Sequence, residues 1–283
     1  MRAEINGAEL VLETFGERHD PAVLLIMGGA ASMDRWEPAF CERLAAAGRY
    51  VIRYDHRDTG GSTTYPPGEP GYTADDLAGD AIGILDHLEV GRAALVGLSM
   101  GAALCQVIVL RHPERVSAVA LLSTSSAGEG GPELPGMSDE LQAAFSGEGE
   151  PEPDWSDREA ALDHLLDAER PYAGSRGLEE DALRELIAVT YDRTPSPASA
   201  NNHFMVDGTP FAHERLAEIA VPVLVVHGSD DPLFPLAHGE ALAAAIPGAE
   251  LLVLDGVGHE LPRSAWDEVL PALIELTRPR DAP

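Results

Sequence analysis

Short, unbroken apolar runs alternate with helical patterns along most of this chain, and this alternation limits its possible folds more than any other feature. PAVLLIMGG, ALVGLS and VPVLVVHG are runs of this kind. Strands that are apolar at every position are buried on both faces, as in parallel sheets covered by helices on both sides. The sequence therefore predicts an α/β fold with a mostly parallel sheet.

Local signals place individual elements within this pattern. Asn6 and Gly7, between two alternating runs, predict a β-hairpin. Thr73 followed by Asp76 has the spacing of a capping box and predicts the start of a helix. Helical periodicity predicts further helices over residues 37–47, 236–245 and 264–277.

The alternation of strand and helix is interrupted between residues 127 and 205. This part begins with a run rich in proline, glycine and acidic residues and continues with short amphipathic helices. We predict that it is a helical cap inserted into the α/β core. Residues 1–126 and 206–283 then form the first and second parts of that core.

Charge and composition argue against several partners. With 48 acidic and 19 basic residues, the chain has a net charge of -29, which disfavours nucleic acid and anionic membrane surfaces. No apolar stretch approaches the roughly 18 residues of a membrane span, and no signal sequence is evident, so we predict a cytoplasmic protein. The two cysteines are predicted to be buried free thiols, which fit a reducing compartment. The sequence is compatible with a monomer or a homodimer.

Lysine is absent, since all 19 basic residues are arginines. This absence excludes a phosphate-binding Walker loop, a pyridoxal Schiff base and a Ser–Lys hydrolase. The sequence also lacks histidines and carboxylates clustered at metal-ligand spacing. Neither a metal nor any other cofactor is predicted.

Ser99 stands between a predicted strand and a predicted helix, with Gly97 and Gly101 two residues to either side. In open α/β sheets, ligands bind beyond the carboxyl ends of the strands, where this serine lies. Glycines relieve the crowding around a nucleophile held in a sharp strand-to-helix turn, so GLSMG predicts a nucleophile elbow. The alternative is a serine that only caps a helix.

A serine hydroxyl needs a base to accept its proton, and histidine suits this task. His259, in the loop GVGHELP after the last predicted strand, is the candidate base. The acid that orients the histidine has to come from a strand end between the serine and the histidine. Asp230 and Asp231 compete for this role. We favour Asp231 and interpret Asp230 as a turn residue that binds backbone amides.

Acyl transfer also requires hydrogen-bond donors for the developing oxyanion. The amide of Met100, directly after the serine, is one candidate donor. The other is the amide of Gly29, in the loop where Gly28 and Gly29 follow the run LLIM. Alternatively, the sequence MGG is only a flexible strand exit.

These motifs resemble those of serine hydrolases of the α/β-hydrolase superfamily, over essentially the whole chain outside the cap. MGG at 27–29, YDHRDTGGST at 54–63, VGLSMG at 96–101 and GVGHELP at 256–262 are most similar to the aclacinomycin methylesterase group. Enzymes of that group hydrolyse the methyl ester of an anthracycline. The resemblance implies a sheet of the eight-stranded type and carboxylic-ester hydrolysis through an acyl-enzyme on Ser99, without a cofactor.

Two positions depart from the commoner superfamily pattern. Most members have His-Gly where this chain has Met27 and Gly28, so a side-chain hydrogen bond that steadies the oxyanion loop is missing. Many members have glycine where Asp58 stands, and the methylesterase group shares both departures. Asp55 and Arg57 are expected to be structural.

The pocket and the exact chemistry are less determined by the sequence. The candidate substrate-binding residues are Gly28, Met33, Trp36, Trp155, Phe204, Phe234 and Leu261. We predict a small-molecule ester as the substrate, polyketide-like or otherwise bulky and apolar. The same triad also supports perhydrolysis, as in cofactor-free haloperoxidases, and cleavage of carbon–carbon bonds. An alternative of another class is a ligand receptor that uses a hydrolase fold without turnover.

Overall fold

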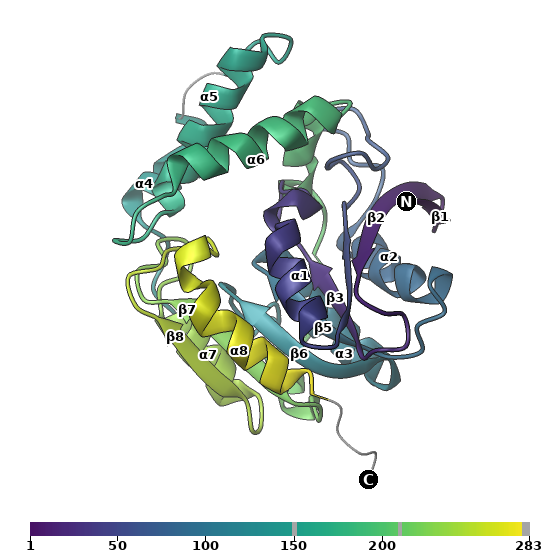
Figure 1. Ribbon diagram of the computed structural model, residues 1–283. Helices are drawn as coiled ribbons and strands as arrows, with labels where there is room; N and C mark the ends of the chain where they lie inside the picture. The colour runs from purple at the N-terminus through teal and green to yellow at the C-terminus, as the bar shows by residue number, and fades with distance from the viewer. Residues whose placement is uncertain (149–151, 209–210, 279–283) are drawn as a thin grey trace.

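A computed structural model describes residues 1–148, 152–208 and 211–278 and contains an eight-stranded central sheet (Figure 1). Its strand order is β1-β2-β4-β3-β5-β6-β7-β8. The pairs β1/β2 and β2/β4 are antiparallel, and the remaining neighbours pair in parallel. The strands are β1 (Arg2–Ile5), β2 (Ala8–Phe15), β3 (Ala22–Ile26), β4 (Tyr50–Tyr54), β5 (Ala93–Leu98), β6 (Val116–Leu122), β7 (Val223–Gly228) and β8 (Glu250–Leu254). The predicted mostly parallel α/β sheet is confirmed.

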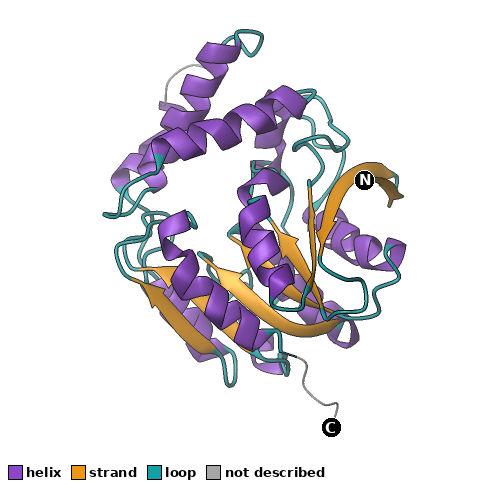
Figure 2. Cartoon of the chain, in the orientation of Figure 1, coloured by secondary structure: helices purple, strands orange, loops and turns teal. Residues whose placement is uncertain are grey.

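Helices cover both faces of the sheet (Figure 2). The covering helices are α1 (Pro38–Ala46), α2 (Ala74–His87), α3 (Met100–Arg111), α7 (Ala237–Ala245) and α8 (Trp266–Leu276). Val23 and Leu25 of β3 pack in one core with α1 and α8, whereas Leu24 and Ile26 pack in a second core with α2, α3 and α7. Successive side chains of a strand point to opposite faces, which is why these strands are apolar at every position.

The local predictions agree with the structure at several turns and caps. Asn6 and Gly7 have φ angles of 49° and 78° and connect β1 to its antiparallel neighbour β2, as the hairpin signal predicts. Thr73 and Asp76 form both hydrogen bonds of a capping box at the start of α2. The helices predicted over 37–47, 236–245 and 264–277 are α1, α7 and α8.

Between β6 and β7, the described residues contain three α-helices, namely α4 (Asp139–Ala143), α5 (Arg158–Glu169) and α6 (Glu180–Arg193). Figure 1 shows α5 and α6 apart from the layers that cover the sheet. Leu162 and Leu166 of α5 pack against Leu183 and Ile187 of α6 in a small apolar cluster of their own. These helices fall in the segment predicted to be a cap, whose boundaries at residues 127 and 205 remain predictions.

Ion pairs fasten this helical segment to the sheet. Arg193, at the end of α6, pairs with the buried carboxylates of Asp34 and Asp55. Asp55 also accepts hydrogen bonds from the amides of Met33 and Gly61, both at 3.0 Å. Burying a carboxylate is costly unless it is paired and hydrogen-bonded, and Asp55 is both.

Within the described ranges, no helix has the length and apolar character needed to cross a membrane. The same residues contain no group of three or more histidine, cysteine or carboxylate side chains that could hold a metal ion. Cys41 and Cys105 are free and buried. Burial raises the pKa of the Cys41 thiol to about 12, which keeps it protonated and unreactive.

Candidate active site

Ser99 occupies a strained turn between β5 and α3. Its backbone has φ 53° and ψ -117°, a conformation that non-glycine residues rarely adopt. A Cβ atom at Gly101 would lie 2.2 Å from the carbonyl oxygen of Ile26. One at Gly97 would lie 2.4 Å from the carbonyl oxygen of Gly101. Only glycine fits at both positions, which explains the two glycines that flank the serine in the sequence.

Asp231 holds the ring of His259 from the loop that follows β7. Its Oδ2 atom accepts a hydrogen bond from His259 Nδ1 at 2.9 Å. The other carboxylate oxygen accepts from the amides of Leu233 and Phe234, both at 2.9 Å. Asp231 is 3% exposed, so these three bonds replace the water that an ionised carboxylate would otherwise have. The arrangement places the proton on Nδ1 of His259 and leaves Nε2 for exchange with another group.

Asp230, the competing acid, has a different environment. It accepts hydrogen bonds from the amide of Ser175 at 3.1 Å and from the hydroxyl of Ser229 at 2.9 Å. These bonds to its charged form lower the pKa of its carboxyl group. The geometry therefore puts Asp231, and not Asp230, beside the histidine.

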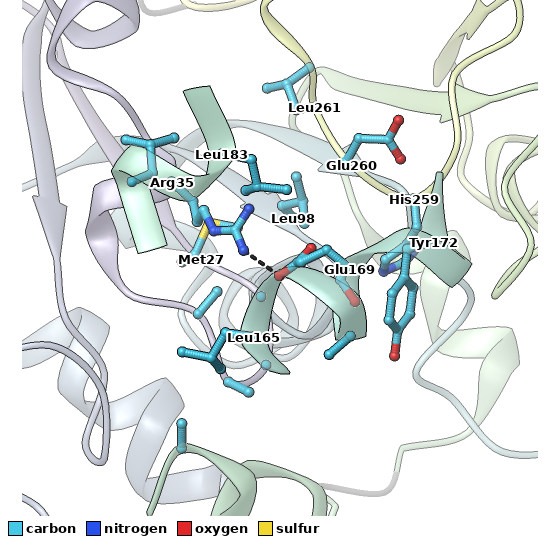
Figure 3. A pocket seen from close by; sticks show the side chains of 18 of the residues that line it. Met27, Arg35, Leu98, Leu165, Glu169, Tyr172, Leu183, His259, Glu260 and Leu261 are labelled. Atoms are coloured by element: carbon cyan, nitrogen blue, oxygen red, sulfur yellow. Dashed lines mark hydrogen bonds and ion pairs between the residues drawn. The ribbon is translucent and has the colours of Figure 1, made fainter. Parts of the chain in front are cut away.

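The loop that carries His259 rests on the chain between α5 and α6. The amide of His259 donates to the carbonyl oxygen of Tyr172 at 2.9 Å, and the two rings lie 5.8 Å apart (Figure 3). Nearby, the amide of Arg176 donates to the carbonyl oxygen of Gly256 at 2.9 Å. The backbone around His259 is therefore supported by residues of the helical segment as well as by β8.

Two further titratable groups lie next to this pair. The His227 ring, which is fully buried, donates from Nε2 to the carbonyl oxygen of Phe234 at 2.7 Å and lies 3.6 Å from Asp231 Oδ2. Burial lowers the pKa of His227, which keeps the ring neutral. Burial also raises the pKa of the Glu260 carboxyl group, an effect that backbone amides beside it oppose.

Ser99 and His259 line one cavity of about 670 Å³. Its walls are mostly apolar and include Leu165 and Leu183 from the helical segment (Figure 3). The ion pair between Arg35 of the short helix η1 (Met33–Arg35) and Glu169 of α5 is a polar feature of this wall. Cavities of this size enclose drug-sized ligands, and a few polar groups in an apolar lining orient them.

The loop after β3 passes directly over Ser99. A Cβ atom at Gly28 would lie 3.4 Å from Cβ of Ser99, and Gly28 and Gly29 both line the cavity. Met100 is the first residue of α3 and lines the cavity as well. Backbone amides at the N-terminus of a helix are not used within the helix and can bind an anion.

Of the seven residues predicted to bind substrate, five line this cavity and two do not. Gly28, Trp36, Trp155, Phe204 and Leu261 line it. Met33 does not line the cavity. Its side chain is buried, and its backbone amide bonds Asp55 Oδ1. Phe234 also lies outside the lining, since its ring packs against His259 and His238 at centroid distances of 5.7 and 5.4 Å.

Several other residues of the cavity were not among the predicted site residues. They include Arg35, His164, Glu169, His203 and Glu260. The first four are polar residues in helices or loops without a surrounding motif, and only the packing of distant segments brings them to the cavity. The glutamate directly after His259 is the one position where a nearby motif could have drawn attention to the residue.

The sheet order, the elbow at Ser99 and the His259–Asp231 pair define the class of protein. The chain belongs to the alpha/beta hydrolase fold family, whose model matches residues 21–262. Among known proteins it is similar to rhodomycin D methylesterase DauP of Streptomyces sp. (strain C5), with 33% identity over 94% of each chain. It is 31% identical to rhodomycin D methylesterase DnrP of Streptomyces peucetius, again over 94% of each chain. The resemblance to methylesterases inferred from the sequence is confirmed by these relatives.

Solved structures agree with this assignment. The enol-lactonase from Burkholderia xenovorans LB400 is 29% identical and superimposes with a TM-score of 0.70 over 97% of each chain. The lactonase shares the fold along nearly the whole length of this chain, the helical segment between β6 and β7 included.

Proposed function

We propose that the protein is a carboxylic-ester hydrolase in which Ser99 is the nucleophile, His259 the base and Asp231 the residue that orients the histidine. The observation that carries this proposal is the 2.9 Å bond between His259 Nδ1 and Asp231 Oδ2, on a histidine that lines the same cavity as Ser99. The strained elbow at Ser99 supports it, since backbone strain of this kind occurs at functional sites.

The reaction proceeds through an acyl-enzyme. Ser99 Oγ attacks the carbonyl carbon of the ester while Nε2 of His259 accepts the hydroxyl proton. The tetrahedral intermediate collapses, and the leaving alkoxide takes that proton and departs as an alcohol. Water then gives a proton to His259 and attacks the acyl carbon, which releases the carboxylic acid and restores the serine. Asp231 stabilises the imidazolium that forms in each half of the reaction.

The amides of Met100 and Gly29 are the proposed donors to the oxyanion. Met100 supplies an amide at the start of α3, where the helix dipole also favours negative charge. Gly29 belongs to the loop that passes over Ser99. Donors of this kind stabilise the transition state because they are already oriented before charge develops.

We propose a methyl ester of a bulky, mostly apolar acid as the substrate. The cavity of about 670 Å³ has room for a polycyclic molecule, and its leucine-rich wall suits an apolar one. The two relatives are named for the methyl esterase reaction on rhodomycin D, which agrees with this substrate class. The Arg35–Glu169 pair offers hydrogen-bonding partners to a polar substituent.

A fluorophosphonate probe tests the nucleophile. We expect one probe per wild-type chain and none on Ser99→Ala, because the probe reacts only with an activated serine. Ser125→Ala is the matched control, since the Ser125 hydroxyl also bonds a histidine, His238 Nδ1, at 2.8 Å. This control should label like the wild type. A folded wild type that remains unlabelled would contradict the proposal and favour a ligand receptor.

A substrate panel tests the substrate class. We expect kcat/KM for methyl esters of polycyclic aromatic acids to exceed that for p-nitrophenyl acetate by at least about tenfold, because the larger acid buries more apolar surface in the cavity. A preference for the acetate ester would remove the polycyclic substrate. Turnover of ring-fission diketones or of peroxide with acetate, without ester turnover, would instead indicate carbon–carbon hydrolysis or perhydrolysis.

A further inference from the structure

His203 connects the helical segment to the loop over Ser99. It lies in the short helix η5 (Pro197–Phe204) and is 4% exposed. Its Nδ1 atom accepts a hydrogen bond from the amide of Ala30 at 3.0 Å, and its Nε2 atom donates to the carbonyl oxygen of Arg57 at 2.8 Å. Both bonds together require a neutral ring with the proton on Nε2. Burial lowers the pKa of His203, which favours this neutral form.

A second buried histidine holds the beginning of the same loop. His56 Nε2 donates to the carbonyl oxygen of Met27 at 3.1 Å. The rings of His56 and His203 meet edge to face, with centroids 5.7 Å apart. The loop from Met27 to Ala30 is therefore bonded at both ends by histidines that lie outside it.

The loop needs such support because its backbone is strained. Ala30 has a φ of 57°, a left-handed conformation that costs free energy in a residue with a Cβ atom. The bond from its amide to His203 offsets this cost and fixes the peptide plane. Gly29 immediately precedes Ala30. A Cβ atom at Gly29 would lie 3.2 Å from the ring of Phe204, which is the residue after His203, so the loop and the short helix are closely packed here.

We propose that His203 is a positioning residue for the oxyanion loop. By bonding the amide of Ala30, it fixes the orientation of the preceding residues so that the amide of Gly29 faces the position of the oxyanion. This role rests on the proposed function. The hydrogen bond from His203, which belongs to the helical segment, replaces the side-chain hydrogen bond that steadies this loop in most family members and that Met27 cannot make.

Asp58, the second departure from the family pattern, supports the same connection. Its Oδ2 atom accepts hydrogen bonds from Asn202 Nδ2 at 2.9 Å and from the hydroxyl of Tyr72 at 2.7 Å. Asn202 Oδ1 in turn accepts from the amide of Gly68 at 2.7 Å. Asn202 precedes His203, so Asp58 holds the short helix in the place from which the histidine reaches Ala30.

Two substitutions at position 203 test this role. His203→Phe keeps a ring but removes both hydrogen bonds, and we expect kcat for a reactive ester to fall about 10²-fold with KM within about threefold. The rate of fluorophosphonate labelling should fall in parallel, because the probe forms a tetrahedral adduct that uses the same donors. His203→Asn retains an acceptor and a donor, so its kcat should be at least about tenfold higher than that of His203→Phe. His213→Phe, at a partly buried histidine away from this cavity, is the control and should match the wild type.

A folded His203→Phe variant with kcat within threefold of the wild type would overturn the proposal, as would a loss confined to KM. If this variant does not fold, ¹⁵N spectra of histidine-labelled wild type provide the second measurement. We expect a neutral His203 with the proton on Nε2 at pH 7, and an imidazolium or an Nδ1–H tautomer would overturn the proposal. A wild type that neither labels nor hydrolyses esters refutes the proposed function, whereas an active wild type with a fully active His203→Phe refutes only the positioning role.

Discussion

Replacing His259 with alanine is expected to lower kcat for ester hydrolysis by about 10⁵-fold or more, while KM changes little. Without the imidazole, Ser99 has no base to take its proton and the leaving alcohol has no acid to protonate it. The oxyanion donors and the cavity remain, so a small residual rate over water should persist. Single-turnover and steady-state kinetics on the same methyl ester measure the loss.

His213→Ala is the control for this substitution. His213 bonds the hydroxyl of Ser126 at 2.9 Å and does not line the large cavity, so its loss should leave kcat within about twofold. If His259→Ala retained a tenth of the wild-type rate, another group would have to serve as the base and the proposed triad would be wrong.

Asp231→Asn is expected to lower kcat by about 10⁴-fold with the fold intact. The asparagine can present its amide N–H to His259 Nδ1, which moves the ring proton to Nε2 and leaves no acceptor for the serine hydroxyl. The amides of Leu233 and Phe234 can still bond the side-chain oxygen, so the loop should keep its shape. Thermal unfolding of the variant checks that the loss is chemical.

The neighbouring acid supplies a matched control. Asp230→Asn retains an oxygen that can accept from the Ser175 amide, and the change is at an exposed side chain. We expect kcat within about threefold of the wild type. A loss at Asp230 as large as that at Asp231 would mean that the two carboxylates act as one unit in orienting the histidine.

The sequence predicts most accurately the features that depend on neighbouring residues. The hairpin at Asn6 and the capping box at Thr73 are local, and both are confirmed. The apolar runs identify the parallel strands because burial on two faces leaves no polar position. The turn at Ser99 is only partly local: a Cβ atom at Gly97 would meet Gly101 in the same segment, whereas one at Gly101 would meet the carbonyl oxygen of Ile26 in β3.

Features formed by distant segments could not be predicted in the same way. Nothing around His203 in the sequence indicates that its ring bonds Ala30, because the contact depends on how η5 packs against the sheet. The Arg35–Glu169 pair joins η1 to α5 and is equally nonlocal. Met33 was predicted to line the pocket from its apolar character, yet burial outside the cavity lining is just as compatible with that character.

The segment between β6 and β7 contacts the candidate active site at two places. The carbonyl oxygen of Tyr172 bonds the backbone of His259, and His203 bonds the backbone of Ala30. Transplanting this stretch from a relative to broaden the range of accepted molecules would therefore also exchange two scaffolding contacts. We expect a chimera that keeps the cavity lining but loses these two contacts to have a lower kcat. Substrate selectivity and catalytic rate therefore cannot be changed independently by exchanging this segment.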